Sequence, residues 1–268
     1  SKDVTVRCPG LDDVVSFKSR LDSVWSVNAL ANVVNSSAPN LRDTVSFPGP
    51  ENKVRIKSAK KDHLSGGTVW TFSNGFKVVY KKMPSAGRVF YTLALNGGYG
   101  SISDLEAGEG AYLSDYLDLC YIAGLKGTDF KKILSAERVD MQTKVTLSNT
   151  LVSGYAPKGK ISLLMKSLAA IARERRPDAA AFDYYMKCES LGLRFTEGTR
   201  LARMTAIDSI MCPGYRYSSY KSPGKLDSGF ASKAEKFYSG QFAKMNDGVL
   251  AIVGDISEEA LKKVLLEY

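Results

Sequence analysis

The chain has 268 residues, of which 44% are hydrophobic and 24% charged, enough for one large domain or two small ones with a real core. Apolar runs are too short for a membrane-spanning helix, so no membrane span is expected. The net charge is +9, but the basic residues are dispersed and no nucleic-acid-binding motif accompanies them, which argues against a nucleic-acid partner.

A single histidine, His63, is the most restrictive feature of the composition. A catalytic zinc site normally takes three protein ligands, commonly two or three of them histidine, which this chain cannot supply. The polar stretch KSAKKDHLSGG around His63 predicts a surface position. Four cysteines are present and none forms a C-x-x-C pair, so neither a zinc ribbon nor a thioredoxin-type centre is indicated, and the redox compartment stays open.

Residues 1–68 differ in character from the rest of the chain. A loosely periodic helix is predicted at 11–33, followed by the breaker clusters NSSAPN and FPGPEN and by a basic stretch at 53–61. We therefore predict that residues 1–68 are a linker or N-terminal segment with some helix, and that the main domain spans residues 69–268. The start SKDVTVRCPG lacks an initiator Met and an apolar leader, so we expect a processed or excised chain.

The main domain begins with a predicted hairpin, VWTFSNGFKVVYKK, in which Asn-Gly is a strong signal for a tight turn. Asp178, just after Pro177, and Ser257 are predicted N-caps of two later helices. Further strands are expected at 88–96, in two segments of 142–156 and at 248–254; helices are expected at 111–124, 130–139, 160–176, 178–191, 196–213 and 225–242 and after 257. This order predicts an α+β fold in which helices cover a mixed or antiparallel sheet.

The stretch AYLSDYLDLCYIAG at 111–124 is the segment around which we interpret the chain. Its apolar residues Leu113, Tyr116, Leu117 and Cys120 have the spacing of an amphipathic helix, and Gly124 is a stop signal. Tyr112 and Tyr116 are four residues apart and are therefore expected on one helix face.

Three segments together resemble one subdomain of the pitrilysin (insulinase-type) family of zinc peptidases. They are the hairpin WTFSNGFKVVYKK with VFYTLALNGGYG, the segment 110–127, and the ending FYSGQFAKMNDGVLAIVGDISEEALKKVLLEY. The resemblance covers roughly residues 69–268 and is most specific in the ending. In this family two subdomains form one half of the protein, and two halves close around a peptide, one of them holding zinc. The resemblance implies that this chain is one such subdomain.

The chain departs from the catalytic pattern of this family at the metal ligands. In the family, the metal helix carries the motif H-x-x-E-H, and the resemblance aligns this motif with residues 112–116. There the sequence has Tyr112 and Tyr116 in place of the two histidines and Asp115 in place of the Glu that acts as general base. Glu189 falls near the place of the family's third ligand. A phenol with a pKa of about 10 stays protonated at neutral pH and does not replace imidazole as a zinc ligand.

We therefore expect no catalytic or metal-binding residue in this chain. Tyr112, Asp115, Tyr116 and Glu189 are candidate peptide-contacting residues; alternatively, they are inner-face residues of packed helices. Tyrosine offers contact area and a hydrogen bond at low entropic cost, which suits a peptide contact. The loop CPGYRYSSYKSPG holds Tyr215, Arg216, Tyr217 and Tyr220, which form either an interface or an aromatic surface loop.

The leading hypothesis is a non-catalytic domain of a pitrilysin-type zinc peptidase that shapes a closed chamber and holds peptide in extended form, with strand addition to a sheet edge as one mode of binding. Its partners would be a peptide substrate and a catalytic half, in the same polypeptide or a partner subunit, where the zinc is expected. One alternative is a structural scaffold with no peptide role, and a second is a hydrolase with an unrecognised site. By resemblance the protein is expected to be bacterial and periplasmic or otherwise exported, although the sequence leaves the compartment open.

Overall fold

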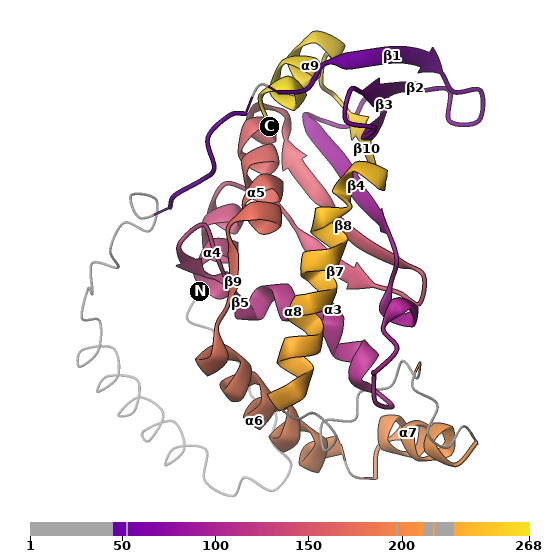
Figure 1. Ribbon diagram of the computed structural model, residues 1–268, viewed down its shortest axis with the longest axis vertical. Coiled ribbons are helices and arrows are strands. Elements are labelled where there is room, and N and C mark those ends of the chain that lie inside the picture. Colours follow the sequence, from indigo (N-terminus) through magenta and orange to yellow (C-terminus); the bar gives the residue numbers. More distant parts are fainter. Residues whose placement is uncertain (1–44, 52, 197, 212–216, 218–227) are drawn as a thin grey trace, which may run out of the picture. The chain divides into compact units, whose positions relative to one another are not determined.

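The computed structural model describes residues 45–51, 53–196, 198–211, 217 and 228–268 (Figure 1). The chain divides into two units, residues 1–41 and 42–268, and all described residues lie in the second. The helix predicted at 11–33 lies outside the described residues. Of the aromatic loop, only Tyr217 is described.

The described part of the chain contains a seven-stranded mixed sheet with the order β1-β2-β3-β10-β4-β8-β7. Strand β10 is parallel to β3 and antiparallel to β4, and the other neighbours are antiparallel. The predicted mixed, helix-covered sheet is thus confirmed. The strands are β1 (Ile56–Lys61), β2 (Thr68–Phe72), β3 (Lys77–Lys82), β4 (Arg88–Asn96), β7 (Gln142–Val145), β8 (Asn149–Pro157) and β10 (Val249–Gly254).

A smaller sheet and a set of helices complete the described fold. The smaller sheet has the order β6-β5-β9, with β5 (Cys120–Ile122), β6 (Leu125–Lys126) and β9 (Arg175–Pro177). The helices are α3 (Leu113–Tyr116), α4 (Gly127–Ala136), α5 (Ile161–Arg173), α6 (Ala179–Thr196), α7 (Arg200–Met211), α8 (Ser228–Ala243) and α9 (Glu258–Glu267).

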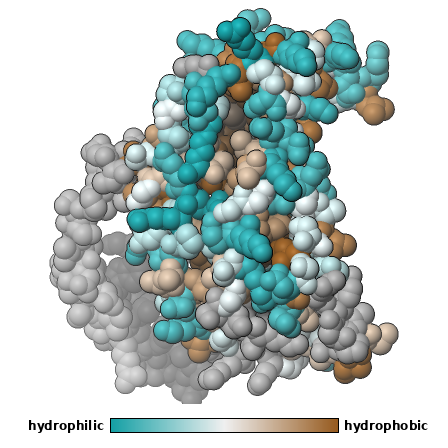
Figure 2. All heavy atoms as spheres, viewed as in Figure 1, coloured by the Kyte–Doolittle hydropathy of each residue, from teal (hydrophilic) through white to brown (hydrophobic). Residues whose placement is uncertain are grey.

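Helices α5, α8 and α9 cover one face of the large sheet, and the core lies between these two layers. In Figure 1, α5 and α8 lie in front of the strands. A cavity of about 300 Å³ is lined jointly by Leu93 and Leu250 of the sheet, Leu168 of α5, Phe242 of α8 and Leu265 of α9. In the same view, Figure 2 shows mostly hydrophilic residues on the outside of this layer, with hydrophobic ones visible between them.

Several predicted elements are confirmed by local chemistry. The turn of the β2–β3 hairpin contains Gly75 with φ 91°, and the Asn74 side chain accepts a hydrogen bond from the Phe76 amide at 3.1 Å. Asp178 accepts from the Ala181 amide at 3.1 Å, and Ser257 from the Ala260 amide at 3.2 Å, as N-caps do. His63 is exposed, as its polar surroundings predict.

The predicted helix at 111–124 is wrong in its second half. Short helical turns at Glu109–Tyr112, α3 and Leu117–Leu119 are followed by β5, which pairs with β6 and β9. Ala123 and Gly124 have φ 51° and 81°, so they form the two-residue turn of a hairpin between β5 and β6. Pairing with β9 thus prevails over the helical spacing of the apolar residues.

Other boundaries also differ from expectation. Residues 56–61, expected in a linker, form β1, because their backbone pairs with β2. Helix α5 ends at Arg173 and not at residue 176, because Arg175–Pro177 join the small sheet. Helix α4 begins at Gly127, three residues before the expected start at residue 130, and α6 extends to Thr196 and not only to residue 191. The division of the chain after residue 68 stays a prediction.

Candidate functional site

The segment that carries Tyr112, Asp115 and Tyr116 is fixed to helix α8. Glu109 is 1% exposed, and its carboxylate forms an ion pair with Lys233 of α8 at 2.9 Å. The hydroxyl of Tyr238, also on α8, donates to the carbonyl of Leu113 at 2.6 Å. These contacts fix the position of α3 within the fold.

The same segment also lies against β7, which is one of the two edge strands of the large sheet. The Ser114 hydroxyl accepts a hydrogen bond from the Val145 amide at 2.9 Å. Val145 pairs with Thr150 on one side, and this amide points to the other side, away from β8. One outward amide of the edge strand is therefore already occupied by α3.

Tyr112, Asp115 and Glu189 come together with a fourth residue, Tyr185 of α6. The Tyr185 hydroxyl donates to Asp115 at 2.7 Å, and its ring meets that of Tyr112 edge-on at 6.3 Å. Burial raises the pKa of the Tyr112 phenol above its ordinary value, and the charges of Glu189 and Asp115 raise it further. The pKa of Tyr185 is raised by burial and then by its hydrogen bond to Asp115. Both phenols therefore remain protonated at neutral pH.

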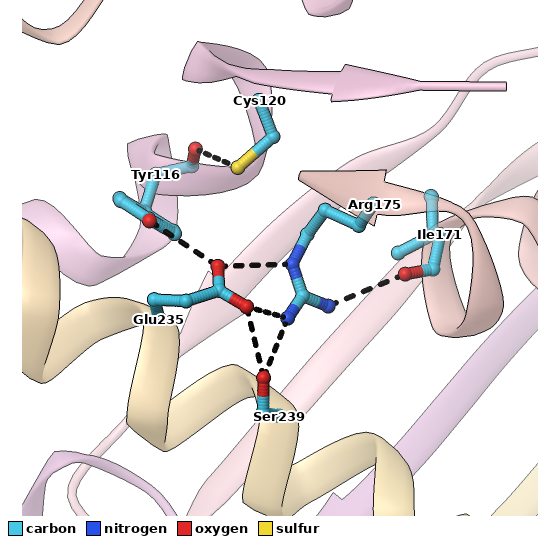
Figure 3. A network of polar contacts seen from close by, with 6 residues as sticks. All are labelled: Tyr116, Cys120, Ile171, Arg175, Glu235 and Ser239. Atoms are coloured by element: carbon cyan, nitrogen blue, oxygen red, sulfur yellow. Dashed lines mark hydrogen bonds and ion pairs between the residues drawn. The ribbon is translucent and has the colours of Figure 1, made fainter. Parts of the chain in front are cut away.

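Tyr116 belongs to a second cluster, centred on an ion pair between α8 and β9 (Figure 3). Its hydroxyl donates to Glu235 at 3.3 Å, and Glu235 pairs with Arg175 at 2.7 Å and 3.4 Å through two nitrogens. Arg175 also donates to the Ile171 carbonyl and to Ser239. Burial opposes ionisation of Glu235, but the hydrogen bonds from Arg175 and Ser239 outweigh it and lower the pKa of the carboxyl.

Not all of the predicted site residues can touch a ligand in this conformation. Tyr112 and Tyr116 are 1% and 2% exposed, whereas Asp115 and Glu189 are half-buried. The two tyrosines thus act within the packing, and the two carboxylates remain accessible. Tyr217 lies apart from them: its ring is 6.4 Å from that of Tyr99, and its hydroxyl donates to the Gly100 carbonyl at 3.4 Å. Tyr215, Arg216 and Tyr220 lie outside the described residues.

The donor groups around α3 do not fit a zinc site. Within the described part of the chain, no group of three or more His, Cys, Asp or Glu side chains is arranged to hold a metal ion. The phenols at 112 and 116 both have raised pKa values, so the proton competes strongly with any metal for their oxygens. That this chain carries no zinc stays a prediction.

Sequence reasoning missed Tyr185, Arg175 and Glu235. Tyr185 and Glu189 are four residues apart on α6, and this spacing was a usable signal that they share a face. Arg175 and Glu235 are 60 residues apart, and no local pattern predicts their pairing.

The fold described above, a mixed seven-stranded sheet with helices on one face, is that of the M16 (pitrilysin-type) peptidase domains. The sequence itself matches no family profile and no curated protein. The likeness rests on solved structures that are 12–15% identical to this chain, and it concerns the fold.

Three solved structures illustrate the likeness. The periplasmic protease PqqL from Escherichia coli aligns with a TM-score of 0.66 and 15% identity over 82% of this chain. A mutant of the ferredoxin protease FusC, in complex with Arabidopsis ferredoxin, aligns with a TM-score of 0.63 and 12% identity over 83%. An inactive M16 peptidase domain from Pseudomonas fluorescens aligns with a TM-score of 0.54 and 14% identity over 77%.

The match spans only part of each of these proteins. It covers 24% of PqqL, 25% of FusC and 50% of the inactive domain. The chain therefore spans about a quarter of the length of PqqL and FusC and about half of the length of the inactive domain. Among the described helices, none is both long and apolar enough to cross a bilayer.

Proposed function

We propose that this chain is a non-catalytic domain of a pitrilysin-type zinc peptidase, which shapes a substrate chamber and binds peptide while hydrolysis takes place elsewhere. The observation that carries the proposal is the chemistry at the motif positions 112–116. Zinc-dependent hydrolysis requires metal ligands and a free base, whereas these positions hold two protonated phenols and a carboxylate hydrogen-bonded to Tyr185, which supports the proposal. The likeness in fold to an inactive M16 domain agrees with this.

Asp115 and Glu189 are the residues we assign to peptide contact. They are half-buried carboxylates that Tyr185 links: its hydroxyl donates to Asp115 at 2.7 Å, and it is one helical turn from Glu189 on α6. Acceptors of this kind bind peptide N–H groups or basic side chains through charge-assisted hydrogen bonds. Peptide contact at these carboxylates does not require strand addition along β7, because Ser114 of α3 already accepts from the outward Val145 amide of that strand.

The proposal needs a partner that supplies the zinc. The catalytic half would belong to the same polypeptide or to another subunit, because a chain with a single histidine cannot supply the two or three imidazoles common in catalytic zinc sites. An exported, periplasmic setting is part of the proposal and corresponds to the location of the periplasmic protease PqqL.

Peptide binding by the 268-residue chain tests the proposal. Fluorescently labelled unstructured peptides would be titrated against the native chain, an Asp115→Asn, Glu189→Gln variant, and a control variant with Asp129→Asn and Glu267→Gln. We expect the first variant to weaken binding by about tenfold, the effect of losing one or two charge-assisted hydrogen bonds. The control should bind as the native chain does.

Two results would count against the proposal. If no peptide binds, or if both variants bind equally well, the scaffold alternative is favoured. Stoichiometric zinc in the purified chain, with a peptidase activity that a chelator removes, would show that the chain is itself an enzyme.

A further inference from the structure

The large sheet has a second face that the described helices leave open. Strand residues alternate between the two faces, so those facing away from α5, α8 and α9 can be read from the register. On strands β2, β3, β4, β8 and β10 none of them is fully buried, whereas their neighbours on the helix side almost all are. We call this surface the open face; across the sheet it comprises Ser58, Lys60, Val69, Thr71, Lys77, Val79, Lys81, Arg88, Phe90, Thr92, Ala94, Asn96, Gln142, Lys144, Asn149, Leu151, Ser153, Tyr155, Pro157, Val249, Ala251 and Val253.

Apolar residues form the middle of the open face. Cross-strand pairing places them, with the polar residues beside them, in rows perpendicular to the strands that run from β3 to β8 and, in the first row, on to β7. The rows are Lys77–Val249–Ala94–Leu151–Lys144, then Val79–Ala251–Thr92–Ser153, then Lys81–Val253–Phe90–Tyr155. Phe90 is 48% and Tyr155 36% exposed, with ring centroids 6.3 Å apart. This is a flat apolar band of small side chains with an aromatic pair at one end.

All the charges on the open face have the same sign. Lys60, Lys77 and Lys81 border the apolar band on one side and Lys144 on the other, while Arg88 lies over the Tyr155 ring. No Asp or Glu occurs among the open-face residues. Lys77 and Lys144 are separated by four strand spacings, about 19 Å at ~4.8 Å per strand.

The size of the open face suits a protein partner. Seven strands span about 29 Å, and a strand of six residues is about 20 Å long, which gives a surface of about 600 Å². A stable protein interface buries about 600–1,000 Å² on each partner, with an apolar centre and a polar rim, so the open face is at the lower end of this range. An apolar band bordered by lysines has this anatomy.

Charge decides which partner fits. A second copy of this chain would bring lysines against lysines, which disfavours self-association through the open face. Nucleic acid needs a continuous track of cations along its phosphates, whereas here apolar residues separate the lysines. An acidic polypeptide with an apolar strip between its carboxylates matches both the band and its borders.

We propose that the open face is a docking surface for an acidic polypeptide segment, which lays apolar residues on the Val79–Ala251–Thr92 band and carboxylates against Lys60, Lys77 and Lys144. This site is distinct from the peptide contact assigned to Asp115 and Glu189. The motif positions pack against α6 and α8 and so lie on the helix-covered side of the sheet.

The test compares matched lysine variants of the full chain. One replaces open-face lysines (Lys60→Gln, Lys77→Gln, Lys144→Gln), and the control replaces exposed lysines of α6, α8 and α9 (Lys187→Gln, Lys236→Gln, Lys263→Gln). Both lose the same charge. The probe is a labelled amphipathic peptide of leucine and glutamate, and its matched competitor has lysine in place of glutamate. Binding is measured by fluorescence anisotropy.

We expect the leucine–glutamate peptide to bind, the open-face variant to weaken binding about tenfold, and the control to change it less than twofold. Phe90→Ala should also weaken binding, and Asp115→Asn, Glu189→Gln should leave it unchanged, which separates this site from the proposed function. Equal losses in the two lysine variants would overturn the proposal. So would tighter binding of single-stranded DNA or of polyglutamate, since either result would mean that the apolar band plays no part.

Discussion

Replacing Glu235 with glutamine is predicted to destabilise the domain by about 3 kcal/mol, a typical cost of breaking a buried ion pair by removing one partner. The reason is the burial of the other partner. The Arg175 side chain is only 4% exposed, against 29% for Glu235, so the guanidinium would keep its charge in a site that water barely reaches. Its remaining contacts are the Ile171 carbonyl, Ser239 and the rings of Tyr238 and Phe242.

The ion pair should also make stability depend on pH. The folded pKa of Glu235 is lowered by Arg175 and Ser239 below its unfolded value of about 4.3. A carboxyl with a lowered folded pKa stabilises the fold fully above the unfolded pKa, and this stabilisation is lost as pH falls through the folded pKa. The native chain should therefore lose stability below about pH 4.3 more steeply than the Glu235→Gln variant.

Urea unfolding at pH 7 of the native chain, Glu235→Gln, Arg175→Met and the double variant provides the measurement. The double variant should be about 1–3 kcal/mol more stable than the sum of the single losses implies, because it leaves no unpaired charge. Asp255→Asn is the control: its pair with Lys158 is exposed and should be worth less than about 1 kcal/mol. Equal losses for Glu235→Gln and Asp255→Asn would refute the reasoning.

Three further predictions concern single residues. Lys233→Met should destabilise the fold by about 3–5 kcal/mol in urea unfolding, since Glu109 is 1% exposed and would lose its cation; a loss below about 1 kcal/mol would contradict a stabilising role for this ion pair. Burial raises the pKa of the Cys120 thiol to about 12, so iodoacetamide at pH 8 should leave it unmodified in the folded chain while it alkylates the exposed Cys188, as peptide mass spectrometry would show. Ser257→Ala should lower the free energy of unfolding by about 1 kcal/mol through loss of the α9 cap, and an unchanged midpoint would contradict the capping role.

The elements that the sequence predicted well are those stabilised locally. Asn74 and Gly75 set the β2–β3 turn through their own conformations, and Asp178 and Ser257 begin helices by accepting amide hydrogens three residues ahead. Such signals depend only on neighbouring residues. Together with the hydrophobic patterns, they were sufficient to predict an α+β fold with a helix-covered sheet; the resemblance to pitrilysin-type domains rested on three longer segments and not on these signals.

The interior of the candidate site was decided by tertiary structure. The spacing of Leu113, Leu117 and Cys120 favoured a continuous helix, but Cys120–Ile122 gain more by pairing with Arg175–Pro177. The sequence alone also left Tyr112 and Tyr116 as candidates for ligand contact, whereas packing of α6 and α8 against α3 buries both side chains.

The sequence by itself thus supported the prediction that no zinc chemistry takes place at positions 112–116, because residue type fixes whether a group can bind zinc or accept a proton. Only the tertiary structure decided which of those groups reach solvent and what they contact. Partners such as Tyr185, Arg175 and Glu235 come from elements far apart in the chain, and a contact between distant elements depends on how all the intervening elements pack.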